Sequence, residues 1–259
     1  MVVDATQAAL VVLAVGLGGV VTGVNGFGFA VVGTSLLASA FDPGQAVTVM
    51  ILPILAANVS LAGELDRSGL RSCVTRFWTY VAAAAAGTVL GMIGLSLIPT
   101  APLVTGLGAF VLAYVAFSQD AVRIPGESRL RGWCFRETDG LKAGLGFVSG
   151  VVFGASNVGV QVVAYLRSLD LDRATFVGVV AMVFLGVGTI RVLAAAFLGL
   201  YEGGGQFVVS AAAIVPGLAG VSVGRRLRTV VPLGPQRAAT FALLTVVGVR
   251  LLLSGLGGL

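Results

Sequence analysis

The chain has 259 residues, of which 57% are hydrophobic and only 10% are charged. About a quarter of the residues of a soluble globular domain are charged, so this composition indicates an integral membrane protein and leaves no room for a soluble domain of ordinary size. The net charge is +5, but the arginines cluster in short intervals between apolar runs. That pattern favours cytoplasmic loops over a nucleic-acid-binding face. The lipid bilayer is therefore an expected partner, and a nucleic acid is not.

Apolar runs separated by polar breaks predict five helical segments in each half of the chain. The first half is residues 1–118, with segments near 7–24, 28–40, 45–63, 77–98 and 102–118. A charged cytoplasmic linker is expected at 119–140, and the second half is residues 141–259, with segments near 141–153, 157–166, 174–199, 206–223 and 236–256. The predicted fold is an all-α polytopic membrane protein made of two membrane repeats.

Each half opens with two runs that are mostly shorter than the roughly 20 residues a spanning helix needs. The two runs are joined by a glycine- and asparagine-containing break, at 23–28 in the first half and 154–159 in the second. Short, interrupted segments at matching places in two halves are typical of a transporter's binding site. The opening pair is expected to form either a re-entrant hairpin or two full spans, followed by three transmembrane helices.

The basic residues predict how the halves are oriented. They occur near residues 67–76, through the linker, at 167 and 173, and at 225–237, whereas intervals 41–44, 99–101 and 200–205 have none. Because basic loops are cytoplasmic, both termini are expected outside, and each half crosses the membrane an odd number of times. Two halves of opposite orientation form an inverted-topology repeat.

Backbone groups freed by a helix break cannot stay unpaired in hydrocarbon, so the two breaks are expected to meet at a polar site near mid-membrane. Helix amino termini after Asn25 and Asn157 would direct N–H groups and positive dipole ends there, which suits a small anionic substrate. Ser156 adds a hydroxyl donor. The alternative, which the sequence leaves open, is that the glycines serve helix packing and the polar side chains bond between helices.

Other residues at the breaks complete the predicted site. Gly26, Gly28 and Gly159 let a ligand approach the backbone, and Phe27 lies between the first two. Thr34 and Gln161 follow about one helical turn beyond the breaks. The predicted substrate-binding residues are Asn25, Gly26, Phe27, Gly28, Thr34, Ser156, Asn157, Gly159, Gln161 and Arg191.

Arg191 places a fixed positive charge inside the apolar run VGTIRVLAAAF. An intramembrane arginine is a functional hypothesis, here that it attracts or binds an anion, and the alternative is that it snorkels to the outer headgroups. Arg250 lies nearer the end of its run, where snorkelling is favoured.

Enzymatic function is not expected. The chain contains no histidine, and all eleven acidic residues fall in loops or at segment ends. Serine–histidine and histidine–metal chemistry are therefore excluded, and neither a catalytic residue, a metal site nor a cofactor is predicted.

The opening GVNGFGFAVVGTSLL and the later GFVSGVVFGASNVGVQVVAYL resemble the two glycine-rich blocks of the sulfite exporter TauE/SafE family of membrane permeases. The segment FVGVVAMVFLGVGTIRVL also fits, and the likeness spans nearly the whole chain. Phe29 replaces a glycine of the family block, Thr34 stands where proline is usual, and Gly159-Val160-Gln161 replaces a proline-rich turn. These departures border the predicted site.

The resemblance implies transport of sulfite, a sulfonate such as sulfoacetate, or a similar small anion across a prokaryotic cytoplasmic membrane. The expected mechanism is alternating access, with an anion channel of the same fold as the main alternative and a scaffold or assembly subunit as a third. The direction of transport, a coupling ion (H+ or Na+) and a homodimer are left open by the sequence.

Overall fold

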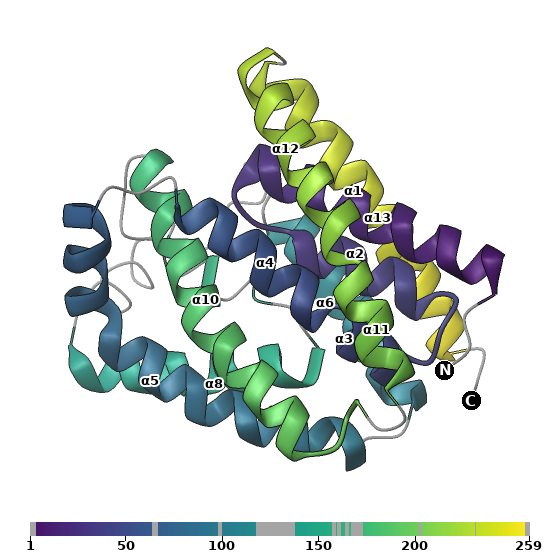
Figure 1. The fold of residues 1–259 in the computed structure, drawn as a ribbon, viewed down its shortest axis with the longest axis horizontal. Coiled ribbons are helices and arrows are strands. Elements are labelled where there is room, and N and C mark those ends of the chain that lie inside the picture. Colours follow the sequence, from purple (N-terminus) through teal and green to yellow (C-terminus); the bar gives the residue numbers. More distant parts are fainter. Residues whose placement is uncertain are drawn as a thin grey trace.

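The computed structural model describes residues 4–63, 67–97, 100–117, 138–156, 159, 162–163, 166, 173–201, 204–230 and 232–256. Within these residues the regular elements are α-helices, with no strand (Figure 1). In chain order they are α1 (Ala5–Asn25), α2 (Phe29–Ala38), α3 (Pro43–Val49), α4 (Ile51–Ala62), α5 (Arg67–Leu97), α6 (Thr100–Phe117), α8 (Asp139–Ser156), α10 (Arg173–Phe197), α11 (Gly205–Ala212), α12 (Ile214–Val230) and α13 (Leu233–Leu256).

Five stretches of the described residues are long and apolar enough to cross a membrane. They are Ala5–Asn25, Pro43–Ala62, Phe77–Gly94, Phe176–Phe197 and Gly205–Val230. The prediction of an all-helical membrane protein is confirmed.

The two breaks begin later than predicted, and the glycines expected to open them lie inside helices. The first break was expected to begin at Gly23, but α1 continues through Asn25, and the second was expected to begin at Gly154, but α8 continues through Ser156. Gly23 lies against the backbone of α12, and Gly154 lies against the backbone of α5. These two glycines let helices approach each other, which is the packing role that the sequence had left as the alternative.

Three helix pairs make the most extensive contacts: α1 with α12, α5 with α8, and α6 with α13. The α1–α12 pair is built on glycines spaced four residues apart, Gly19 and Gly23 on one helix and Gly220 and Gly224 on the other. A Cβ atom added at any of them would lie under 3.0 Å from a backbone atom of the partner helix. Lipid supplies no hydrophobic drive between helices, so such close backbone packing is what holds this pair together.

The α5–α8 pair uses the same device. Gly87 and Gly91 of α5 face the backbone of α8, and Gly146, Gly150 and Gly154 of α8 face the backbone of α5. Every one of these positions would place an added Cβ under 3.0 Å from a backbone atom of the other helix. In the centre, α10 packs against both α4 and α5.

The interruption between α3 and α4 is tied to neighbouring segments through two hydroxyl groups. Pro53 has no N–H to donate to the carbonyl of Val49 one turn earlier. The buried Ser210 hydroxyl of α11 donates to that carbonyl at 2.8 Å. The Tyr201 hydroxyl donates to the Thr48 carbonyl at 3.4 Å. Burial raises the pKa of Tyr201, so its phenol stays protonated and able to donate.

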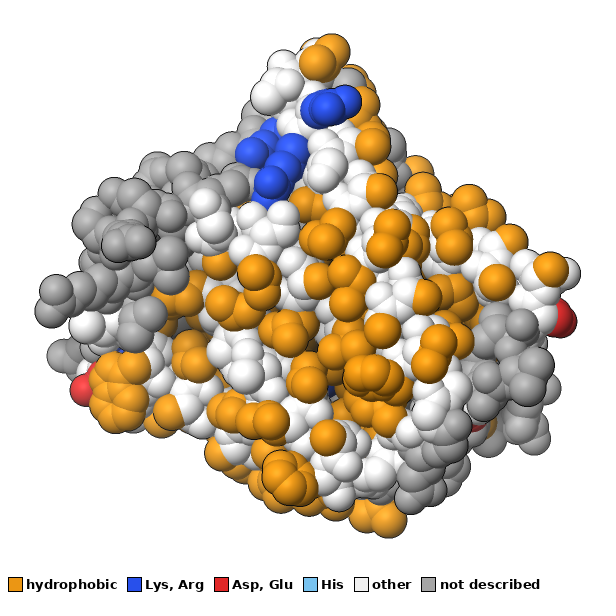
Figure 2. Space-filling model, in the orientation of Figure 1, with side chains coloured by type: hydrophobic (Ala, Val, Ile, Leu, Met, Phe, Trp, Pro, Cys, Tyr) orange, Lys and Arg blue, Asp and Glu red, His pale blue; other side chains and the backbone are white. Residues whose placement is uncertain are grey.

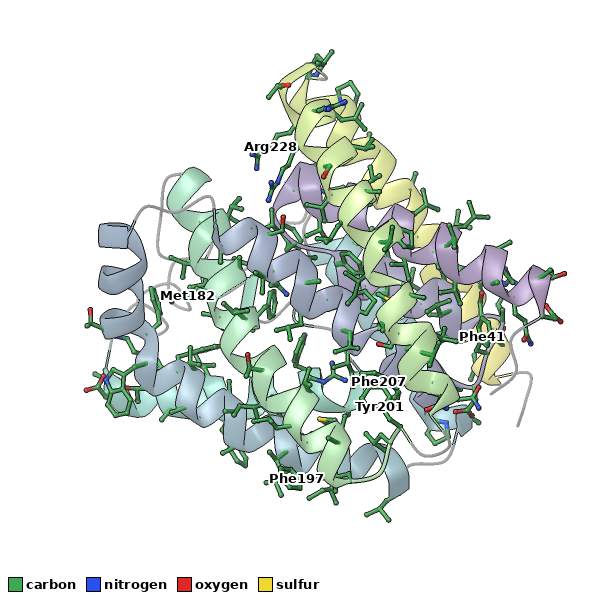
Figure 3. All side chains as sticks on the ribbon, in the orientation of Figure 1. Phe41, Met182, Phe197, Tyr201, Phe207 and Arg228 are labelled. Atoms are coloured by element: carbon green, nitrogen blue, oxygen red, sulfur yellow. The ribbon has the colours of Figure 1, made fainter. Side chains whose placement is uncertain are left out.

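Among the described residues, the face seen in Figure 2 is rich in apolar side chains, with basic side chains gathered at one end. Hydrophobic side chains cover much of the face in Figure 2, and the blue cluster lies at the end of α12, which carries Arg225, Arg226 and Arg228. Figure 3 places Arg228 at that end and shows Tyr201 beside Phe207 at the opposite end of the α11–α12 rod, their ring centroids 5.5 Å apart. A broad apolar surface of this kind suits contact with lipid.

Candidate functional site

A cavity lies between the two interrupted segments that open the halves of the chain. The cavity has a volume of about 30 Å³, which is more than one water molecule needs. Its lining comes from α1, α2, α4, α8, α10 and the segment after α8. The lining residues are Thr22, Phe27, Gly28, Phe29, Ala30, Val31, Ile54, Asn58, Phe153, Gly159, Val163 and Phe184.

The cavity brings the two breaks together, as the argument about unpaired backbone groups requires. Phe27 and Gly28 of the first break and Gly159 of the second all line it. Gly159 is tightly enclosed, because an added Cβ would lie under 3.0 Å from ring carbons of Phe184. Three of the predicted site residues therefore share one cavity.

Other predicted site residues lie elsewhere. Asn25 is the last residue of α1 and Thr34 is fully buried on α2, and neither lines the cavity. Ser156 is the last residue of α8, and its side chain is not among those described. Asn157 and Gln161 lie outside the described residues, so their place in the site stays a prediction.

The first break exists because two glycines adopt a backbone that other residues avoid. Gly26 has φ 81° and Gly28 has φ 107°, both in the left-handed region. Gly26 ends α1, and its N–H donates to the carbonyl of Thr22 at 2.7 Å. Glycine has no Cβ to oppose this conformation, so the chain turns here at little cost.

The helix amino terminus at the cavity belongs to α2, which begins at Phe29, within one residue of the predicted segment 28–40. Gly28 is its N-cap and makes no side-chain capping hydrogen bond. The first three residues of the helix, Phe29, Ala30 and Val31, all line the cavity. The first N–H groups of a helix have no partner within it, so this end presents N–H groups and a positive dipole end to the cavity. Asn25, by contrast, sits at the carboxyl end of α1.

Two polar residues of the cavity were not predicted. Thr22 is 2% exposed, and its Oγ1 has no hydrogen-bond partner within the part of the chain that the structure describes. Asn58 is 5% exposed, and its Nδ2 donates to the Ile54 carbonyl at 2.9 Å. The signal for Asn58 was visible in the sequence, as an asparagine well inside the apolar run 45–63. Thr22 stood at the edge of the first break.

Arg191 is buried, so the snorkelling alternative is wrong. The residue is 1% exposed, and its Cζ lies 5.2 Å from the centroid of the Phe153 ring, which makes a cation–π contact. Its Nε and Nη2 find no hydrogen-bond acceptor among the described residues. Phe153 also lines the cavity and stacks on Phe184 with centroids 5.3 Å apart, so one ring joins the guanidinium to the cavity wall.

The described residues contain no group of three histidine, cysteine, aspartate or glutamate side chains that could hold a metal ion. The polar atoms at the cavity are instead a hydroxyl, an amide and the amino end of α2. Together with a buried guanidinium behind Phe153, these groups favour a small ligand that is negatively charged.

Comparison with known proteins agrees with the geometry. Neither the curated proteins nor the solved structures contain a match to this chain. The family model for the sulfite exporter TauE/SafE matches residues 11–251, which include every described residue of the cavity and of its glycine-packed supports. The chain therefore belongs to the sulfite exporter TauE/SafE family of membrane transporters.

Proposed function

We propose that the protein carries a small anion across the membrane and binds it in the cavity between the two breaks. The observation that carries this proposal is the cavity itself, lined by Phe27 and Gly28 from one break and Gly159 from the other. The Thr22 hydroxyl, which lacks a partner among the described residues, and the uncapped amino end of α2 offer donors to an anion there.

The charge that supports anion binding is that of Arg191. An ionised side chain buried without a counter-charge is costly, and none of the described residues gives its Nε or Nη2 an acceptor. A bound anion would relieve that cost. In the absence of the anion, the face of the Phe153 ring stabilises the guanidinium in part.

The helix pairing supports two inverted repeats. Counting each half from its first helix, the first helix of each half packs on the fourth segment of the other: α1 on α12, and α8 on α5. The third segments, α4 and α10, pack together, and so do the fifth, α6 and α13. A pseudo-two-fold axis between residues 1–118 and 141–259 produces this exchange, and its placement in the membrane plane gives the halves opposite orientation.

We assign the basic end of α12 to the cytoplasm and both termini to the outside, following the positive-inside rule. With inverted halves on either side of the cavity, rocking of one against the other exposes the anion to each side in turn. The substrate class is the one named by the family, sulfite, together with sulfonates and similar small anions.

Transport by site variants tests the proposal. Thr22→Val and Asn58→Leu remove one donor each, and each should slow efflux of sulfite from proteoliposomes by about tenfold, because a hydrogen bond to a charged group contributes about 1.5 kcal/mol. Ser222→Ala is the matched control, since that hydroxyl is exposed and donates within its own helix, to the Leu218 carbonyl. Full transport by both cavity variants would contradict the assignment of the site.

The same vesicles separate a carrier from an anion channel. Alternating access predicts saturable counterflow, in which unlabelled anion inside accelerates uptake of labelled anion. A channel predicts single-channel conductance and no counterflow. Conductance without counterflow would replace the carrier mechanism with a pore of the same fold.

A further inference from the structure

Charge is unevenly distributed in the interior of the protein. The described aspartates, Asp4, Asp42 and Asp139, are exposed at the starts of helices. The buried cations among the described residues are Lys142 and Arg191, and Lys142 lies in the first turn of α8, away from the break that follows this helix. Arg191 is therefore the formal charge that the described residues place behind the cavity wall.

Building on the proposed function, we propose that this site selects small anions with a single negative charge and rejects dianions. The free-energy cost of removing an ion from water rises with the square of its charge. The attraction of the ion to one fixed cation rises only in proportion to that charge. Doubling the charge of the substrate therefore about quadruples the desolvation cost but only about doubles the attraction to Arg191.

The lining of the cavity adds to this preference. Four phenylalanines line it, among them Phe153 and Phe184, and their side chains offer no hydrogen-bond donor to replace the hydration shell of an anion. The donors available are the Thr22 hydroxyl, the Asn58 amide and the amino end of α2. These few groups match the needs of a monoanion, whereas a dianion loses a larger hydration shell than they replace.

The Arg191 guanidinium already contacts the Phe153 ring, which partly stabilises its positive charge and weakens the attraction that a second negative charge would add. The Cζ of Arg191 lies 5.2 Å from the centroid of the Phe153 ring. A single negative charge neutralises this cation, and a second would remain unpaired in an apolar enclosure. Methanesulfonate, hydrogensulfite and small monocarboxylates have the expected charge, and sulfate and doubly charged sulfite do not.

The test is flux through the full-length protein in proteoliposomes. Methanesulfonate and sulfate have similar size and tetrahedral shape but differ in charge, and we expect methanesulfonate to move at least about tenfold faster, equivalent to about 1.4 kcal/mol. Sulfite supplies an internal comparison, because its second proton dissociates near neutral pH. Sulfite flux should fall as the pH rises through neutrality while methanesulfonate flux stays constant, which separates titration of the substrate from titration of the protein.

Two variants link the selectivity to the buried charge. Arg191→Gln should reduce methanesulfonate flux at least about tenfold, and Arg250→Gln, which removes an exposed cation from α13, should leave it unchanged. Sulfate flux equal to or faster than methanesulfonate flux, or sulfite flux that does not fall with rising pH, would overturn the charge selectivity while leaving anion transport intact. Absence of transport for all the anions would overturn the proposed function itself.

Discussion

Replacing Gly150 with alanine should destabilise the protein, although alanine favours helices. Gly150 lies in α8, and an added Cβ would meet the carbonyl oxygen, carbonyl carbon and Cα of Ala84 in α5, all under 3.0 Å away. Backbone atoms of a packed helix cannot rotate aside, so α5 and α8 must separate. Overpacking of this kind costs roughly 1–3 kcal/mol, against a gain of about 0.5–1 kcal/mol from replacing a helical glycine.

The matched control is in the same helix. Nothing lies within 4 Å of a Cβ added at Gly144, so Gly144→Ala should stabilise the protein by about 0.5–1 kcal/mol. Thermal unfolding of both full-length variants in the same detergent, followed by intrinsic fluorescence, gives the comparison, and the expected order is Gly144→Ala above wild type above Gly150→Ala. Stability of Gly150→Ala at or above wild type, or equal shifts for the two variants, would refute the packing argument.

Two further paired comparisons follow from the structure. Gly26→Ala should lower stability more than Gly204→Ala: both residues have positive φ, but only at Gly26 would an added Cβ meet a neighbour, the Val177 side chain at 2.5 Å. Thermal unfolding of both variants measures the difference, and equal losses of stability would contradict this prediction. Ser210→Ala should lower the free energy of unfolding by about 1–3 kcal/mol, because it removes the hydroxyl donor to the Val49 carbonyl. Ser222→Ala removes an exposed hydroxyl and should lower it by less than about 0.5 kcal/mol. Thermal unfolding compares the two variants, and unchanged stability of Ser210→Ala would show that the carbonyl finds another donor.

Hydropathy located the apolar parts of the helices because the requirement it reflects is local, but it did not predict that α5 begins at Arg67, ahead of the predicted segment 77–98. A segment that crosses lipid must be apolar along its whole length, so runs such as 45–63 and 174–199 correspond closely to α3–α4 and α10. The two predicted breaks also contributed Phe27, Gly28 and Gly159, which line one cavity, while their part in binding stays a prediction. The prediction relied on the rule that a helix break within the membrane must lie inside the protein or line a polar cavity.

Helix ends and the remaining cavity residues depended on information from other helices. Gly23 and Gly154 looked like breaks, yet each is helical and packs against a partner that is distant in the chain. Thr22 and Asn58 are single polar residues in or beside apolar runs, and the run itself does not say which face meets the cavity. Arg191 was recognised as unusual, but its contact with Phe153 depends on a side chain of α8, which the apolar run around Arg191 does not show.

Glycine thus has two opposite functions within a few residues of α1 and its exit. At Gly19 and Gly23, four residues apart within the helix, the missing Cβ admits the backbone of α12 and makes the pair rigid. At Gly26 and Gly28 the missing Cβ permits positive φ, so the helix ends and α2 begins at the cavity. Because the tight α1–α12 contact holds the helix up to the break, the backbone groups released there have a fixed position. The proposed anion site, made of such groups, is preorganised by the packing beside it, so we expect residues that never touch the anion to control its binding.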